Sequence, residues 1–108
     1  MGMVVVSLGT LEMIYTHRAV VTVAGGSIGT TTLNVHDGLV QQVLIRSLTS
    51  GLTMFRANIT DESSLVRRHY AFHEGEINDV GLSLPIAGQT TVNITNASAT
   101  DTFRVAFA

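Results

Sequence analysis

Apolar and polar residues alternate in several short runs along this chain, most clearly over residues 53–60. Phe55, Ala57 and Ile59 fall on one face of that run, and polar residues occupy most of the positions between them. Successive side chains of a strand point to opposite faces of a sheet. This period of two therefore predicts a β-strand with one buried face.

Runs rich in Val and Thr, bounded by Gly, Asn, Asp and Ser, predict further short strands. The expected strands cover residues 3–8, 11–18, 19–25, 28–36, 39–48, 53–60, 65–73, 77–84, 89–95 and 102–108, with Pro85 ending the eighth. Nine or ten short strands with frequent turns are typical of an all-β fold. We expect a single-domain antiparallel β-sandwich over residues 1–108, for which a jelly-roll-like topology is one solution.

The last two runs, 89–95 and 102–108, are separated by a short polar segment. This arrangement predicts a β-hairpin whose apolar faces point into one core. The expected core positions are Val92, Ile94, Phe103, Val105 and Phe107.

Residues 61–75 are compatible with two structures. A polar turn followed by a strand at 65–73 would form a hairpin with the strand before it. Alternatively, Asp61 would cap a helix that carries Leu65, His69 and Phe72 and ends at Gly75. The strand-forming composition of the chain favours the hairpin, and the helix is the alternative.

The composition limits the partners that the chain is expected to bind. Charged residues make up 13% of the chain and the net charge is −2, so no basic footprint for nucleic acid stands out. The mean hydropathy is high, at +0.36. However, Gly, Ser and Thr interrupt every apolar run before it reaches the length of a membrane span. We therefore expect no nucleic acid and no membrane as partner, and we attribute the apolarity to burial in an oligomer or larger assembly.

Two groups of side chains have the chemistry of a metal site. His69 and His73 would share one face of a helix, but on a strand they would lie about 13 Å apart, too far for one ion. Glu74, Glu76 and Asp79 form a small acidic cluster without a recognised calcium-loop spacing. We therefore predict neither a metal nor another cofactor, and we interpret the acidic cluster as a solvated loop.

No nucleophile elbow, phosphate-binding loop or dinucleotide fingerprint occurs in the sequence. We therefore expect no enzymatic activity. Candidate interface residues are Val4, Val5 and Val6, an apolar run wider than one small core requires, and the group Arg67, Arg68 and Tyr70. For the three Val residues, burial in the core of the same subunit is the alternative. Arg suits contacts at interfaces. Arg67 and Arg68 beside His69 and Tyr70 could instead form a small anion or nucleic-acid patch, but a solvated strand face or a protein contact is the favoured interpretation.

Several segments of the chain resemble the small all-β structural proteins of tailed bacteriophage particles, including capsid decoration (cement) proteins. The resemblance covers residues 30–108 and lies in strand rhythm and turn chemistry. It is carried by Ile59-Thr-Asp-Glu62, Glu74-Gly-Glu-Ile77, Leu84-Pro-Ile-Ala-Gly88, Thr91-Val-Asn-Ile94 and Phe103-Arg-Val-Ala-Phe107. Residues 1–29 do not match it, and we expect them to be an arm or strands exchanged with a neighbour.

The resemblance implies a non-enzymatic virion structural protein, made in the host cytoplasm and located on the capsid surface. It would stabilise contacts between shell subunits as a homo-oligomer, with a trimer favoured, bound to a major capsid protein or another virion protein. A neck, tail or fibre-base protein is an alternative within this class. A lectin-like glycan-binding β-sandwich is a second alternative, for which Tyr15 and Tyr70 are the candidate stacking residues.

Overall fold

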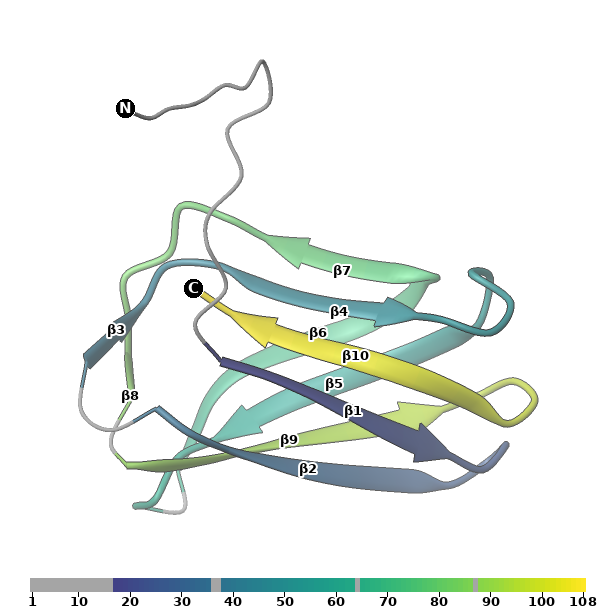
Figure 1. The fold of residues 1–108 in the computed structure, drawn as a ribbon, viewed down its shortest axis with the longest axis horizontal. Coiled ribbons are helices and arrows are strands. Elements are labelled where there is room, and N and C mark those ends of the chain that lie inside the picture. The colour runs from purple at the N-terminus through teal and green to yellow at the C-terminus, as the bar shows by residue number, and fades with distance from the viewer. Residues whose placement is uncertain (1–16, 36–37, 64, 87) are drawn as a thin grey trace.

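The computed structural model describes residues 17–35, 38–63, 65–86 and 88–108, which form ten β-strands and no helix (Figure 1). The strands are β1 (His17–Val23), β2 (Ile28–Asn34), β3 (Gly38–Val40), β4 (Val43–Ser47), β5 (Met54–Thr60), β6 (Val66–Glu74), β7 (Glu76–Asp79), β8 (Leu84–Ile86), β9 (Gln89–Asn96) and β10 (Asp101–Phe107). Within these ranges, no helical segment has the length and hydrophobicity that a membrane crossing needs.

Two four-stranded antiparallel sheets face each other across the core (Figure 1). One sheet has the order β1-β10-β4-β7 and the other β2-β9-β5-β6, while β3 and β8 pair in a short ribbon. Among the eight sheet strands, consecutive strands lie in opposite sheets, except for the β5–β6 hairpin. This is the strand arrangement of a jelly roll, so the predicted β-sandwich with jelly-roll-like topology is confirmed.

Four connections that cross between the sheets lie together at one end of the sandwich, which we call the crossing end (Figure 1). They are residues 24–27, residues 48–53, Gly75 and residues 97–100. Backbone hydrogen bonds join them: Gly26 N–H donates to Asn96 O beside the 97–100 connection, Ala97 N–H donates to Met54 O beside the 48–53 connection, and Gly75 N–H donates to Thr53 O, each at 2.9 Å. The crossing end is therefore one connected set of loops.

The core fills the space between the sheets with the inward-facing residues of each strand. Phe55 and Phe103 meet there edge to face, with ring centroids 4.8 Å apart, which is a favoured aromatic geometry. Val92, Ile94, Phe103, Val105 and Phe107 are all buried, so the predicted core side of the last two strands is confirmed.

The predicted hairpin between the last two strands is wrong. β9 pairs with β2 and β5, whereas β10 pairs with β1 and β4 in the opposite sheet. Asn96 and Asp101, which flank the connecting loop, are buried and bond to other parts of the crossing end. Asn96 donates to the carbonyls of Val23 and Ala99, so its side chain holds the loop as a bridge between sheets.

Two other expectations need correction. The run 39–48 is divided into β3 and β4, because at Gln41 and Gln42 the backbone turns aside to bond the backbone of Ala108. The run 77–84 is divided into β7 and β8, and Pro85 lies within β8 instead of ending a strand. β8 pairs with β3 alone, and such an edge position tolerates a residue without an N–H.

The hairpin alternative for residues 61–75 is confirmed, and the helix is wrong. β6 pairs with β5 from Val66 to Glu74, with two irregularities in register. Residues 17–29 belong to the segment expected as an arm or exchanged strands, but they form β1 and the start of β2 within their own sandwich. Residues 3–8, 11–16 and the Val4–Val6 run lie outside the described residues.

Candidate functional site

The outer face of the β2-β9-β5-β6 sheet carries a row of polar side chains. The strand register places Thr30, Asn93, Asn58 and His69 opposite one another across the four strands. Thr30 Oγ1 donates to Asn93 Oδ1 at 3.0 Å, and Asn93 Nδ2 donates to Asn58 Oδ1 at 2.9 Å. The row is thus a directed chain of hydrogen bonds that ends at the amide of Asn58.

A groove of about 350 Å³ opens beside this row. We call it the polar groove, and its lining consists of Ile28, Arg56, Ala57, Asn58, His69, Asn93 and Thr95. Its volume is in the range of small-molecule sites. Every lining residue with a polar side chain comes from β5, β6 or β9, so the sheet itself fixes their spacing.

Arg56 and Phe72 form one boundary of this face. The Arg56 guanidinium lies over the Phe72 ring, with its central carbon 5.3 Å from the ring centroid. This is cation–π distance, and it holds a long side chain in place on the sheet surface. Phe72 is 45% exposed and Ile28 is 67% exposed, so exposed apolar groups accompany the polar groups at the groove.

A second cluster joins the edge strands β6 and β7. Asp79 Oδ2 accepts a hydrogen bond from Tyr70 Oη at 2.8 Å and is paired with Arg68 Nη2 at 2.9 Å. Burial raises the pKa of the Tyr70 phenol, and the hydrogen bond to the Asp79 carboxylate raises it further. These groups, with His73 and Glu76, line a shallow depression of about 470 Å³. Asp79 is therefore the common partner of Arg68 and Tyr70. The cluster links β6, at the edge of one sheet, to β7, at the edge of the other.

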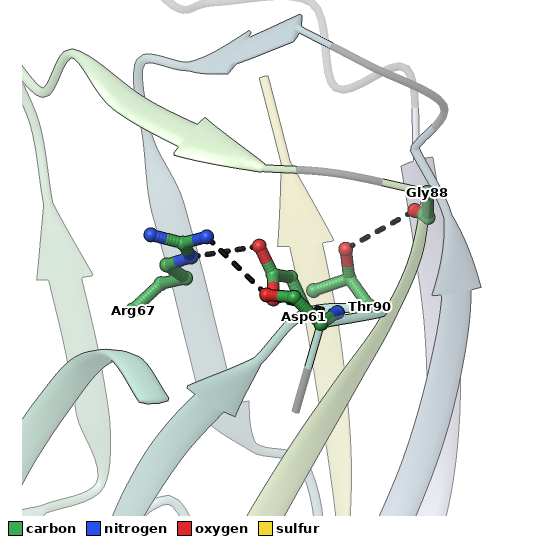
Figure 2. A network of polar contacts seen from close by, with 5 residues as sticks. Asp61, Arg67, Gly88 and Thr90 are labelled. Atoms are coloured by element: carbon green, nitrogen blue, oxygen red, sulfur yellow. Dashed lines mark hydrogen bonds and ion pairs between the residues drawn. The ribbon is translucent and has the colours of Figure 1, made fainter. Parts of the chain in front are cut away.

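A third cluster lies at the β5–β6 turn (Figure 2). The Asp61 carboxylate accepts hydrogen bonds from the backbone N–H and the hydroxyl of Ser63, and Arg67 Nε lies 2.7 Å from Asp61 Oδ2. In Figure 2 the Arg67 guanidinium points at this carboxylate, and nearby the Thr90 hydroxyl donates to Gly88 O. The hydrogen bond from the Ser63 hydroxyl lowers the pKa of Asp61 by more than burial raises it. Together with Arg67, it brings this pKa from the usual 3.8 to about 2.

The acid dependence of stability tests the Asp61 cluster. A carboxyl whose folded pKa is depressed stabilises the fold above its unfolded pKa, and the stabilisation is lost as the pH falls through the folded value. We expect Asp61→Asn to lower the free energy of unfolding at pH 7 and to have a smaller effect as the pH falls from about 4 towards about 2. Urea unfolding at several pH values measures this, with Glu74→Gln as an exposed control. An effect of Asp61→Asn that is constant with pH contradicts the assignment.

The structure separates the three candidate interface residues of β6. Arg67 pairs with Asp61, and Arg68 pairs with Asp79, at distances of 2.7 Å and 2.9 Å. Tyr70 is only 7% exposed and belongs to the core cluster. Tyr70 therefore cannot present an open ring for a sugar, which removes the stacking role that the lectin-like alternative gave it. Tyr15, its other candidate, lies outside the described residues.

The two His residues and the acids considered for a metal site are dispersed along the strands. His69 faces the polar groove, whereas His73 Nδ1 lies 2.7 Å from Ala71 O. Glu76 is paired with Arg46 and Asp79 with Arg68. The part of the chain that the structure describes contains no group of three or more potential metal-ligating side chains.

The polar groove is not apparent from the sequence alone. The alternation of apolar and polar residues places Arg56 and Asn58 on the polar face of one predicted strand. It places Asn93 and Thr95 on the polar face of another. The missing information was that β5 and β9 are neighbours in register, with Asn58 opposite Asn93. A search for polar, uncharged residues at outward positions of neighbouring strands would have found the row.

Comparisons with known proteins address the fold. No protein-family model and no curated protein matches this sequence. Among solved structures, PirA is similar with a TM-score of 0.52 at 12% identity, over 94% of this chain and all of the other. Yersinia pseudotuberculosis-derived mitogen is similar with a TM-score of 0.52 at 10% identity, over 88% of this chain and 86% of the other. Aeromonas hydrophila PliG, a periplasmic inhibitor of g-type lysozyme, is similar with a TM-score of 0.51 at 13% identity, over 85% of this chain and 87% of the other.

Identities this low show a common fold and carry no function from one protein to another. Together with the strand order, they define the class of the chain as a small all-β domain with a jelly-roll sandwich.

Proposed function

We propose that the chain is a non-enzymatic virion structural protein that attaches to a capsid surface and stabilises contacts between shell subunits. The jelly-roll strand order supports this proposal, because viral capsid domains are among the proteins that use that architecture. The observation that carries the proposal is a difference between the two edges of the β2-β9-β5-β6 sheet.

The β6 edge has the features that prevent strands from pairing with other chains. It carries Arg67, Arg68 and Glu74, and its pairing with β5 contains two register shifts. Charged side chains and bulges are the usual protection of an exposed sheet edge.

Within the described residues, the β2 edge shows neither charged side chains nor register shifts. All seven residues of β2, Ile28 to Asn34, are uncharged and pair with β9 in continuous register. Val20, on the neighbouring edge strand β1 of the other sheet, is 57% exposed. An edge strand that is regular and uncharged is a suitable template for pairing with a strand of another chain. We propose that a sister copy pairs here, which builds the homo-oligomer that binds the shell.

Sedimentation velocity tests the proposal with purified protein, alone and mixed with capsid particles of its own virus. We expect the wild-type chain to form an oligomer, with a trimer as the expected size, and to cosediment with the particles. Thr32→Lys places a charge at an exposed position of the β2 edge and should shift the oligomer towards monomer. His73→Lys, the matched change on the protected edge, should not. A wild-type monomer that leaves the particles unbound contradicts the proposal.

The same mixtures separate the alternatives within this class. Cosedimentation with isolated tails or fibres, and none with shells, would assign the chain to the neck, tail or fibre base. A lectin-like module is the second candidate function, and the observation that favours it is the polar groove on the outer face of the sheet.

A further inference from the structure

We infer that the polar groove binds an acidic oligosaccharide, with Arg56 holding a sugar carboxylate and the amides of the sheet holding sugar hydroxyls. This inference concerns a ligand site on the sheet face, and it does not depend on assembly through the β2 edge. It rests on three properties of the groove: open hydrogen-bond donors, charge and shape.

The first property is a set of donors that the described fold leaves open. Asn58 Oδ1 accepts from Asn93, but Asn58 Nδ2 makes no hydrogen bond to any described residue. The Thr95 hydroxyl and the His69 ring have no described partner either. Asn side chains and hydroxyls match the paired donor and acceptor character of sugar hydroxyls. The row from Thr30 to Asn58 fixes the orientation of the Asn93 and Asn58 amides, so the open Asn58 N–H groups are preorganised.

The second property is an uncompensated positive charge. Arg56 forms no ion pair within the described part of the chain, unlike Arg46, Arg67 and Arg68. None of the residues that line the groove is an acid. The ring of Phe72 lies against the guanidinium, while the N–H groups radiate in the guanidinium plane and stay available. A planar carboxylate is the anion that such a fork binds in bidentate geometry.

The third property is shape. The groove opens to solvent on the outer face of the sheet, with the apolar side chain of Ile28 in its lining and Phe72 beside Arg56. An extended ligand that is partly apolar on its ring faces fits such a surface better than a compact one. Nucleic acid is disfavoured because a phosphate chain needs several basic groups, and Arg56 is the sole Arg in the lining.

Nuclear magnetic resonance titration of the full chain tests the inference. The probes are a short oligogalacturonate, its neutral methyl ester and single-stranded oligothymidylate. We expect the acidic oligosaccharide to shift the side-chain amide signals of Asn58 and Asn93 and the Nε–H signal of Arg56. The methyl ester should bind at least about tenfold more weakly, since it lacks the charge-assisted hydrogen bonds.

Matched variants locate the contact. Arg56→Gln should weaken binding of the acidic oligosaccharide by at least about tenfold. Arg104→Gln, which removes an exposed Arg of β10 outside the groove, should leave it unchanged. Asn58→Ala should weaken both the acidic and the neutral probe. Equal binding of the methyl ester, equal or tighter binding of oligothymidylate, signal shifts away from the groove, or no binding at millimolar concentrations would each overturn the inference.

Discussion

Replacement of Asp101 by Ala is expected to lower the free energy of unfolding by about 3–5 kcal/mol. Asp101 is 2% exposed, and its carboxylate accepts hydrogen bonds from the hydroxyls of Ser47 and Thr53. The backbone N–H groups of Thr49 and Thr102 also donate to it, at 2.9 Å and 2.7 Å. Removal of the carboxylate would leave the buried hydroxyls of Ser47 and Thr53 without this acceptor, and an unpaired buried donor costs more than the bond contributed.

The charge of Asp101 is part of this effect. Burial alone raises the pKa of the Asp101 carboxyl, but the hydrogen bonds from Ser47, Thr53 and Thr49 together lower it below its usual value. Asp101→Asn keeps the shape and loses the charge, so we expect a smaller loss of stability than for Asp101→Ala. Chemical denaturation measures both variants.

A double variant distinguishes loss of the acceptor from general disturbance of the crossing end. In the Asp101→Ala background, Thr53→Val removes one of the orphaned hydroxyls and should recover part of the lost stability. In the wild-type background, Thr53→Val should lower the free energy of unfolding, because it removes a hydrogen bond to Asp101. An Asp101→Ala loss below about 1 kcal/mol would show that the carboxylate does not hold the loops together.

Gly75→Ala is the second substitution for which we expect a large loss, about 3 kcal/mol or more. Gly75 is the single residue between β6 and β7, where the chain changes sheets, and its φ is +77°. A Cβ atom there would lie 2.3 Å from the carbonyl oxygen of Gly51, a contact that requires one of the two backbones to move. The substitution therefore combines backbone strain with a steric overlap.

Gly81 supplies the matched control for Gly75. Its φ is also positive, at +70°, but a Cβ atom built there meets nothing within 4 Å. Gly81→Ala should thus cost only the backbone term, about 1 kcal/mol. Thermal unfolding of the two variants measures the difference, and equal losses would contradict the close approach of the Gly75 and Gly51 connections.

The crossing end explains how the sandwich supports a surface site. Asn96 and Asp101 hold the 97–100 connection between the sheets, and Ser98 Oγ accepts from Met54 N–H at the start of β5. These hydrogen bonds lie next to the Phe55–Asn96 pair, at which the pairing of β5 with β9 ends. The row that ends at Asn58 lies farther along the same two strands.

The alternation of apolar and polar residues was a reliable guide to which side chains face inwards. Phe55, Ala57 and Ile59 are all buried, as the period of two in residues 53–60 predicted. It was less reliable where backbone contacts from distant residues intervene. The run 39–48 is interrupted because the backbone of Ala108 bonds the backbone at Gln41 and Gln42, and no local pattern records that contact.

The sequence by itself determined that this protein is built from short strands with one apolar face, because side-chain alternation is a local property of the backbone. Only the tertiary structure decided which strands are neighbours. Pairing uses N–H and C=O groups that nearly every residue carries, so the sequence could not distinguish a β9–β10 hairpin from the observed crossing between sheets. The same uncertainty concealed the candidate site, because Asn58 and Asn93 meet only once β5 and β9 are paired in register.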